Sequence, residues 1–331
     1  MSRLEPSPVR EIQAAQERIA DTAVRTPLVR LNLEDTPADI YLKLENLQPV
    51  GSFKMRGAGN AVLKAVEEGL EERVWTVSAG NMAQGLAWYA HHVGLPSSVL
   101  VPEDAPATKL AALERMGTEI VSVSHEETFR VAASGRYAGI QGHFVHPFAD
   151  PDVIAGNGTI GLEILEDLPT VDAVVIPYGG GGLSVGIASA LQAQSPGMRV
   201  FAAEVETAAP LAASLAAGSP QEVTRTPSFI DGIGHPLVYP DMWHLARRLL
   251  TSSLVVPLAE VVAAIRLLLE RHRIVVEGGG ATALAAALAG GVDGEKIVCI
   301  VSGGNLDARS LRAILRGEIP EGPRGGKDHS G

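Results

Sequence analysis

Lys54 and its neighbours form the stretch of this sequence best suited to chemistry. Residues 51–58 read Gly-Ser-Phe-Lys-Met-Arg-Gly-Ala and lie between an apolar strand-like run at 40–44 and an amphipathic helical pattern. Most lysines are solvated surface charges, and Lys54 taken alone would be interpreted the same way. A lysine at a strand-to-helix junction, beside an aromatic side chain and flanked by glycines, is instead placed to be covered by a bound group. Its amine could then attach that group covalently or remove a proton.

A run of four glycines at 179–182 follows the apolar run 173–176 and precedes a helical pattern at 183–194. Consecutive glycines let backbone N–H groups converge without side chains in the way, and the start of a helix adds positive dipole. The run therefore predicts a phosphate cradle. It has neither the Gly-Lys-Ser/Thr of a Walker loop nor the Gly-x-Gly-x-x-Gly spacing of a dinucleotide site. A simple tight turn would need only one or two glycines.

Two more polar loops follow strand-like runs. Residues 78–81, Ser-Ala-Gly-Asn, separate the run 74–77 from a helical pattern, where an ordinary helix cap explains them equally well. Residues 302–305, Ser-Gly-Gly-Asn, follow the most apolar strand-like run of the chain. Ligands bind at the carboxyl ends of the strands in open α/β sheets. Because these loops and Lys54 all follow strand-like runs, together they favour a ligand-binding role for both loops.

Strand-like and helical patterns alternate along the chain and define what must position these loops. An opening amphipathic helix is predicted within 9–23. Apolar strand-like runs follow at 40–44, 74–77, 98–101, 119–123, 172–176, 199–203 and 296–301. Helical patterns lie near 57–68, 82–93, 107–116, 158–166, 183–194, 258–272 and 280–289. Such alternation predicts an α/β fold of parallel sheets flanked by helices.

Length, charge and composition limit the class of protein. The 331 residues are 46% hydrophobic, which is enough for two lobes with a large core. A net charge of −11 and a pI near 5.3 argue against a nucleic-acid partner, which needs a basic surface. The sequence shows neither a signal peptide nor an apolar run long enough to span a membrane, and its single cysteine, Cys299, lies in an apolar run. A cytoplasmic protein with a buried thiol is expected.

Taken together, the motifs resemble the fold type II pyridoxal-phosphate enzymes, and among them the serine/threonine dehydratase (threonine ammonia-lyase) and serine racemase group. The resemblance covers nearly the whole chain. Besides the four loops it includes the segments 146–148, 153–165, 231–232 and 277–281. Four ordered motifs at the family's spacing make the resemblance specific.

The resemblance implies a two-lobed fold like that of the tryptophan synthase β subunit. A small lobe, 73–150, would be inserted in a large cofactor-binding lobe made of 1–72 and 151–319, with the cofactor in the cleft between them. The remaining residues, 320–331, are Gly-rich and charged and are expected to be disordered. A homodimer is implied as well.

The resemblance also assigns roles to single residues. Lys54 would hold pyridoxal 5'-phosphate as a Schiff base and then remove the Cα proton of the substrate. The other cofactor contacts implied are Phe53 beside the ring, Asn81 at the ring hydroxyl, Ser302 at the ring nitrogen, and Gly179, Gly180, Gly181, Gly182 and the Leu183 amide around the phosphate. The substrate carboxylate would be held by Ser78, Gly80, Asn81 and Met82.

The reaction implied is elimination of water and ammonia from L-serine or L-threonine, leaving a 2-oxo acid. A serine at the ring nitrogen makes the ring a weaker electron sink than an aspartic acid would, which favours prompt loss of the β-hydroxyl group. Ala79 replaces the hydroxyl that racemases resembling this chain use as the base on the opposite face, so little serine racemisation is expected.

Two further differences from the family's usual motifs leave the identity of the substrate open. Met82 replaces the usual histidine, and Glu-Gly-Gly-Gly at 277–280 replaces Glu-Pro-Ser-Gly. The alternatives are therefore a dehydratase for another β-hydroxy amino acid, such as 3-hydroxyaspartate or phenylserine, or, less favoured because of Ala79, a serine racemase. A non-catalytic amino-acid-binding protein with the same fold is a hypothesis of a different class, because a fold alone does not deliver function.

The family's divalent cation site is matched only in part. Glu204 matches its first carboxylate and Ala208 could provide a carbonyl oxygen, but Pro210 stands where the second carboxylate would be. Hard cations need several oxygen ligands, some of them charged. A divalent or monovalent cation at Glu204 and Ala208 is therefore left open, whereas the histidines at 91–92 and at 143 and 146 are expected to be cap and loop residues.

Overall fold

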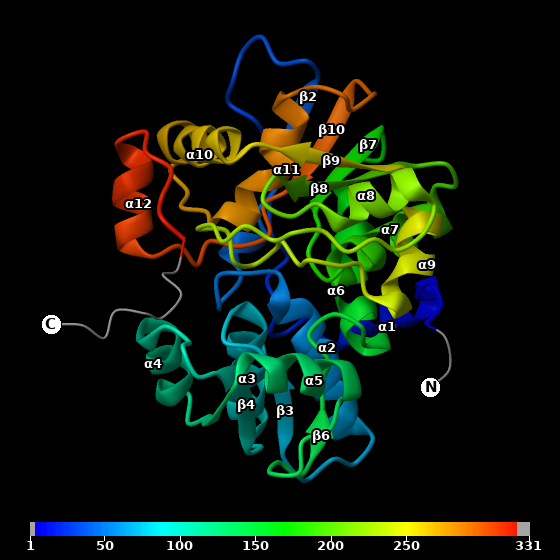
Figure 1. Ribbon diagram of the computed structural model, residues 1–331. Coiled ribbons are helices and arrows are strands. Elements are labelled where there is room, and N and C mark those ends of the chain that lie inside the picture. Colours follow the sequence, from blue (N-terminus) through cyan, green and yellow to red (C-terminus); the bar gives the residue numbers. More distant parts are fainter. Residues whose placement is uncertain (1–3, 323–331) are drawn as a thin grey trace, which may run out of the picture.

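The computed structural model describes residues 4–322, which form two β-sheets flanked by helices (Figure 1). The larger sheet has six strands in the order β1-β2-β10-β7-β8-β9. Its strands are β1 (Leu28–Arg30), β2 (Asp39–Lys43), β7 (Ala173–Pro177), β8 (Arg199–Val205), β9 (Ser252–Val256) and β10 (Lys296–Ile300). Neighbouring strands are parallel except β1, which runs antiparallel to β2. The expected parallel α/β architecture is confirmed.

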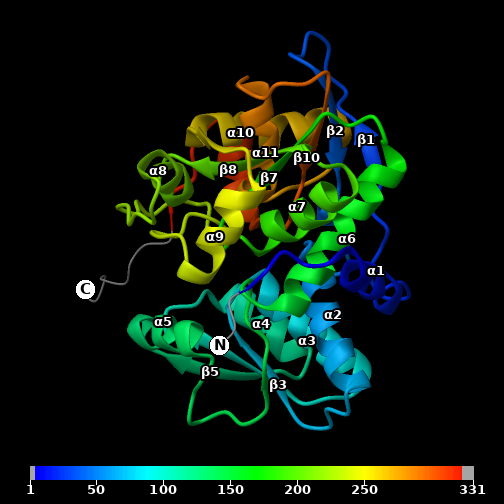
Figure 2. The same cartoon turned by 90° about the vertical axis from the view of Figure 1, so that its right-hand side faces the viewer.

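The smaller sheet has four parallel strands in the order β5-β4-β3-β6. They are β3 (Val74–Val77), β4 (Ser97–Pro102), β5 (Glu119–Val123) and β6 (His143–Phe144). All four fall inside 73–150, and in both views they lie on the opposite side of the molecule from the larger sheet (Figures 1 and 2). The exact division of the chain into lobes stays a prediction.

Helices cover both faces of the larger sheet. Side chains of α6 (Pro151–Asp167), α7 (Gly182–Gln194), α8 (Pro210–Ala217) and α9 (Pro240–Leu249) share one hydrophobic cluster with Val174 and Ile176 of β7. Side chains of α10 (Leu258–Leu267), η2 (Leu268–His272), α11 (Gly278–Leu288) and α12 (Ala308–Leu315) share another with Val175. The remaining helices are α1 (Val9–Arg18), η1 (Glu45–Leu47), α2 (Lys54–Glu67), α3 (Asn81–Val93), α4 (Ala107–Arg115) and α5 (His125–Ser134).

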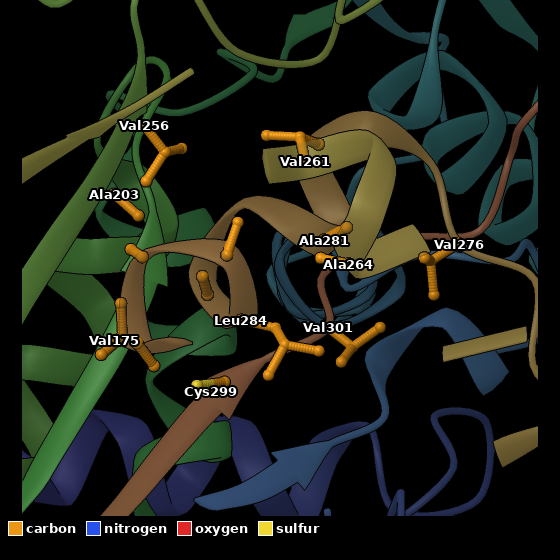
Figure 3. Packing of buried hydrophobic residues seen from close by; sticks show 14 of the residues in the cluster. Val175, Ala203, Val256, Val261, Ala264, Val276, Ala281, Leu284, Cys299 and Val301 are labelled. Carbon is orange, nitrogen blue, oxygen red and sulfur yellow. The ribbon is translucent and has the colours of Figure 1, made fainter. Parts of the chain in front are cut away.

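The alternation along β7 follows from the two-residue period of a strand, which turns successive side chains to opposite faces. Both faces are buried, so every residue of β7 is apolar. Figure 3 shows the cluster on the α11 side, which includes Val175 of β7, Cys299 of β10 and Leu284 of α11. Cys299 is fully buried, as expected.

Helix α2 connects the two sheets, because it packs against α3 on one side and against α6 on the other. Its first turn contains Arg56, which is 2% exposed and lies between two buried carboxylates. The Arg56 guanidinium donates to Glu45 over 2.8 Å and to Glu163 over 2.6 Å, and Lys43 donates to Glu163 over 2.5 Å. Two buried cations thus balance two buried anions, and the cluster fixes the position of the helix turn that begins with Lys54.

The sequence patterns missed several short elements and set some boundaries too late. Strands β1, β6 and β9 and helices α5, α8, α9 and α12 were not expected, while α2 and α6 begin earlier than their helical patterns. Of the tail expected to be disordered, residues 323–331 lie outside the described part of the chain, whereas Pro320 is buried. Within residues 4–322, no helix has both the length and the apolar character needed to cross a membrane.

Candidate active site

Lys54 is the first residue of α2 and is partly buried. Its Nζ donates a hydrogen bond to the carbonyl oxygen of Pro147 over 2.5 Å and lies 5.2 Å from the centroid of the Phe53 ring. No carboxylate within residues 4–322 forms an ion pair with it. Burial without a counter-charge lowers the pKa of Lys54 to about 8, because the charged ammonium loses hydration. About a tenth of this amine is therefore unprotonated at pH 7, and about half at pH 8.

The loop that accepts the Lys54 hydrogen bond is held at both ends. At its start, Nδ1 of His146 accepts from the amides of Phe148 (3.2 Å) and Ala149 (2.9 Å). At its end, Asp150 caps α6 by accepting from the amide of Asp152 over 2.8 Å. Burial and the nearby Lys54 charge lower the pKa of His146 to about 4, so the imidazole is neutral and can accept these bonds. His146 is a loop residue, as the sequence predicted.

The glycine run at 179–182 packs against Phe148, which belongs to the loop that contains His146 and Pro147. A Cβ atom on Gly180 would lie 2.4 Å from the Phe148 ring, and one on Gly182 would lie 2.6 Å from the Phe148 carbonyl oxygen, so only glycine fits at these two positions. Gly181, with φ of +91°, is the N-cap of α7 and makes no side-chain capping bond. Within residues 4–322, no side chain caps the first-turn amides of α7. This uncapped glycine cradle fits a phosphate group.

The loop at 78–81 also ends at an uncapped helix. The N-cap of α3 is Gly80, and no side chain caps it, so the alternative of a plain Ser78 or Asn81 cap is wrong. Ser78 instead accepts a hydrogen bond from the Gly80 amide over 3.1 Å. The Met82 side chain is 2% exposed and packs into the core with Met55 and Leu86, so only its backbone is available to a ligand.

Asn81 links the remaining segments of the site. Its Nδ2 donates to Oε1 of Glu277 over 2.8 Å, and its Oδ1 accepts from Asn305 over 2.8 Å. Burial, reinforced by the charge of Asp231, raises the pKa of Glu277 to about 7. The sequence had marked Glu277 only as part of a variant motif, and the contact that joins it to Asn81 spans 196 positions. No local signal could have indicated it.

The end of β10 lies directly beside the Lys54 segment. The Ser302 carbonyl oxygen accepts from the Phe53 amide over 2.9 Å, and Ser52 forms an isolated β-bridge with Gly303. Gly303 also packs against Glu277, since a Cβ there would lie 2.3 Å from Oε1. The structure thus brings together Lys54, Ser302 and Asn81 from three separate loops.

An aromatic group beside Lys54 was missed by the sequence. Phe148 packs against Tyr239 with 4.5 Å between ring centroids, and His235 lies 6.0 Å from Phe148. Burial, with a further contribution from the Lys54 charge, lowers the pKa of His235 to about 4. The segment carrying His235 follows no strand and shows no periodicity, so only the fold reveals that it belongs to the site.

Glu204 lies in β8, the strand paired with β7, and Ala208 follows that strand. The Glu204 carboxylate accepts from the amides of Leu211 (2.9 Å) and Ala212 (2.8 Å) in the first turn of α8, and from the Ser253 hydroxyl (2.6 Å). Both oxygens are therefore satisfied as a helix cap without a cation. Within residues 4–322, no group of three or more His, Cys, Asp or Glu side chains is placed to hold a metal ion.

A partly buried lysine amine, a glycine cradle at an uncapped helix and two parallel sheets define the class of the protein as a fold type II pyridoxal-phosphate enzyme. The sequence model of the family described as "Pyridoxal-phosphate dependent enzyme" matches residues 19–303. The chain belongs to this family, and its cofactor is pyridoxal 5'-phosphate.

Relatives and solved structures agree with this assignment. The L-threonine ammonia-lyase of Thermotoga maritima is 38% identical over 317 residues, covering 94% of this chain and 79% of that protein. The catabolic L-threonine dehydratase TdcB of Escherichia coli K12 is 36% identical over 316 residues, covering 93% of this chain and 96% of that protein.

Two solved structures have closely similar folds. The structure of maize serine racemase matches with a TM-score of 0.83 and 32% identity, covering 94% of this chain and 98% of that chain. A threonine deaminase from "T.th." matches with a TM-score of 0.82 and 35% identity, covering 90% of this chain and 98% of that chain. The resemblance inferred from the sequence is confirmed.

Proposed function

We propose that this protein removes water and then ammonia from a small β-hydroxy amino acid, L-threonine or L-serine, and releases a 2-oxo acid. The observation that carries the proposal is the Lys54 amine, which is free of any carboxylate partner in the described chain and has a pKa lowered to about 8. The names of the relatives, L-threonine ammonia-lyase and L-threonine dehydratase, support the substrate class.

The cofactor would be held by residues from four loops. The amides of Gly179, Gly180, Gly181, Gly182 and Leu183 would bind its phosphate, Asn81 its ring hydroxyl and Ser302 its ring nitrogen, with Phe53 beside the ring. Support comes from the uncapped start of α7 and from the glycines that admit no Cβ. When bound, pyridoxal phosphate supplies a carbonyl group that captures amines and a ring that withdraws electrons from Cα.

The substrate carboxylate would lie at the start of α3. The amides of Gly80, Asn81 and Met82 are not used by a side-chain cap, and a helix N-terminus favours an anion. The Ser78 hydroxyl accepts from Gly80 and still has its own proton to donate. A carboxylate bound there would fix the orientation of the substrate relative to Lys54.

Lys54 would act as the base that removes the Cα proton. A base is most effective when its pKa lies near the working pH, and burial brings the pKa of Lys54 to about 8. The carbonyl of Pro147 holds the amine in place, and the neutral imidazole of His146 holds the loop that carries this carbonyl. No second base is present at position 79, which is an alanine, so elimination is favoured over racemisation.

A screen for keto-acid release tests the proposal. Purified protein is incubated with L-threonine, L-serine, 3-hydroxyaspartate and phenylserine, with Lys54→Ala as the matched control. Release from L-threonine or L-serine by the wild type, and its loss in Lys54→Ala, is expected. Release only from one of the other two would establish the alternative substrate, and release from none would favour an amino-acid-binding protein.

A cytoplasmic homodimer is part of the proposal, and sedimentation of the purified protein tests the dimer.

A further inference from the structure

Tyr178 joins β7 to the glycine run and has a hydroxyl group without a partner. The residue is 2% exposed, and its ring packs in the cluster that contains Ile176 and Met242. Within residues 4–322, its hydroxyl oxygen is buried and forms no hydrogen bond. A buried hydroxyl that gives up water and gains nothing in exchange destabilises the protein. Such a group is explained if it is satisfied by something that binds.

The hydroxyl lies beside the glycine cradle. It is 3.0 Å from the position that a Cβ atom on Gly181 would occupy, and the methyl group of Met242 lies 3.3 Å from the same position. Gly181 is the N-cap of α7, where the amides have no side-chain cap. An unpartnered, buried hydroxyl thus lies directly beside the glycine-built start of this helix.

The surroundings keep this hydroxyl protonated. Burial and the charge of Glu204 on the neighbouring strand β8 both raise the pKa of Tyr178 above its ordinary value. Glu204 is not its acceptor, because the carboxylate is occupied by the α8 amides and by Ser253. Tyr178 can therefore only meet an anion as a hydrogen-bond donor.

We propose that Tyr178 is a phosphate-binding residue, whose hydroxyl donates a hydrogen bond to the cofactor phosphate held by the amides at 179–183. The proposal rests on the proposed function and adds a side chain to a cradle that the sequence predicted from backbone amides alone. A hydrogen bond to a charged acceptor is stronger than one between neutral groups, so Tyr178 contributes specifically to binding of the phosphorylated cofactor.

Binding of two probes to the cofactor-free protein tests this role. Protein stripped of cofactor is titrated with pyridoxal 5'-phosphate and, separately, with pyridoxal, which lacks the phosphate. Tyr178→Phe should raise the Kd for pyridoxal 5'-phosphate about tenfold and leave that for pyridoxal unchanged. The control is Tyr89→Phe, which removes a hydroxyl that is already bonded to Thr22 over 2.9 Å, far along the chain from the cradle. It should change neither Kd.

Thermal unfolding of the cofactor-free proteins separates binding from folding. Because the Tyr178 hydroxyl has no partner, Tyr178→Phe should unfold at the same temperature as wild type or higher, whereas Tyr89→Phe should unfold lower. An unchanged Kd for pyridoxal 5'-phosphate in Tyr178→Phe, or an equal loss for pyridoxal, overturns the proposal. Failure of the wild type to bind pyridoxal 5'-phosphate at all would instead contradict the proposed function, so the two failures are distinct.

Discussion

Replacing Arg56 by methionine should destabilise the protein far more than the same replacement of a surface arginine that also forms ion pairs with two carboxylates. Arg56 lies between Glu45 and Glu163, and all three side chains are at most 5% exposed. Removing one partner of a buried ion pair costs about 3–5 kcal/mol, because the charge left behind is neither hydrated nor paired. Methionine fills a similar volume, so the loss of charge dominates.

Arg25 provides the matched control. It also contacts two carboxylates, Glu166 and Asp167, both over 2.5 Å, but its side chain is 48% exposed. Exposed ion pairs contribute about 0–1 kcal/mol. With an unfolding entropy of ~0.7 kcal/mol/K for 331 residues, the Tm of Arg56→Met should fall by about 4–7 °C and that of Arg25→Met by about 1 °C or less.

The loss of stability caused by Arg56→Met should also depend on pH. Burial acts to raise the pKa of Glu45, but the charge and hydrogen bonds of Arg56 outweigh it and hold that pKa below its ordinary value. Without Arg56, only the Thr26 hydrogen bond and the Lys43 charge would oppose burial, which is the largest influence on the pKa of Glu45. That pKa should therefore rise, so the carboxylate would take up a proton as the pH falls and the cost of its buried charge would decrease. The gap in Tm between wild type and Arg56→Met should therefore narrow from pH 7 to about pH 5. Calorimetry of the cofactor-free proteins measures this gap in Tm. An Arg56→Met protein that melts no lower than Arg25→Met would show that the buried ion pairs of Arg56 do not stabilise the fold.

Three more predictions concern the site. Because the pKa of Lys54 is lowered to about 8, capture of pyridoxal phosphate by the stripped protein should speed up with pH and level off above about pH 8; a rate that is flat from pH 6 to 9 would contradict this. The pKa of Glu277, raised to about 7, should give the visible spectrum of the loaded enzyme a titration near pH 7 that Glu277→Gln abolishes; its persistence in the variant would exclude Glu277 as the group responsible. Since Ala79 has no proton to deliver, L-serine should give pyruvate with little D-serine, and Ala79→Ser should raise the D-serine to pyruvate ratio; chiral chromatography showing equal accumulation in the wild type would contradict it.

The sequence predicted those parts of the fold that local patterns determine. Strands β7 and β10 lie at the centre of the sheet and are buried on both faces, so β7 is a continuous apolar run and β10 is one after the half-buried Lys296 at its start. Strand β6 has only two residues, and β9 is exposed or half-buried along most of its length, so neither produces such a run. The helical pattern near 57–68 placed the start of α2 too late, because the helix begins at Lys54 and its first turn includes the buried Arg56.

The site likewise has residues that the sequence predicted and residues that only the fold reveals. The roles of Lys54 and the glycine run could be predicted from the sequence because a few adjacent residues indicate them. The acceptor of the Lys54 hydrogen bond lies 93 positions away, and the partner of Asn81 lies 196 away, so both depend on tertiary packing. Tyr178 resembled any apolar residue at the end of a strand. Only its burial beside Gly181, without a partner in the described chain, distinguishes it.

Reduction with borohydride followed by peptide mass spectrometry identifies the lysine that binds the cofactor. Among residues 4–322 the one fully buried lysine is Lys43, which is already paired with Glu163 over 2.5 Å, whereas Lys54 is partly buried and has no carboxylate partner. If Lys54 binds the cofactor, the purified protein is yellow, loses its colour on reduction and carries the phosphopyridoxyl group on the peptide containing Lys54. A label on Lys43, on any other lysine, or on none would contradict it.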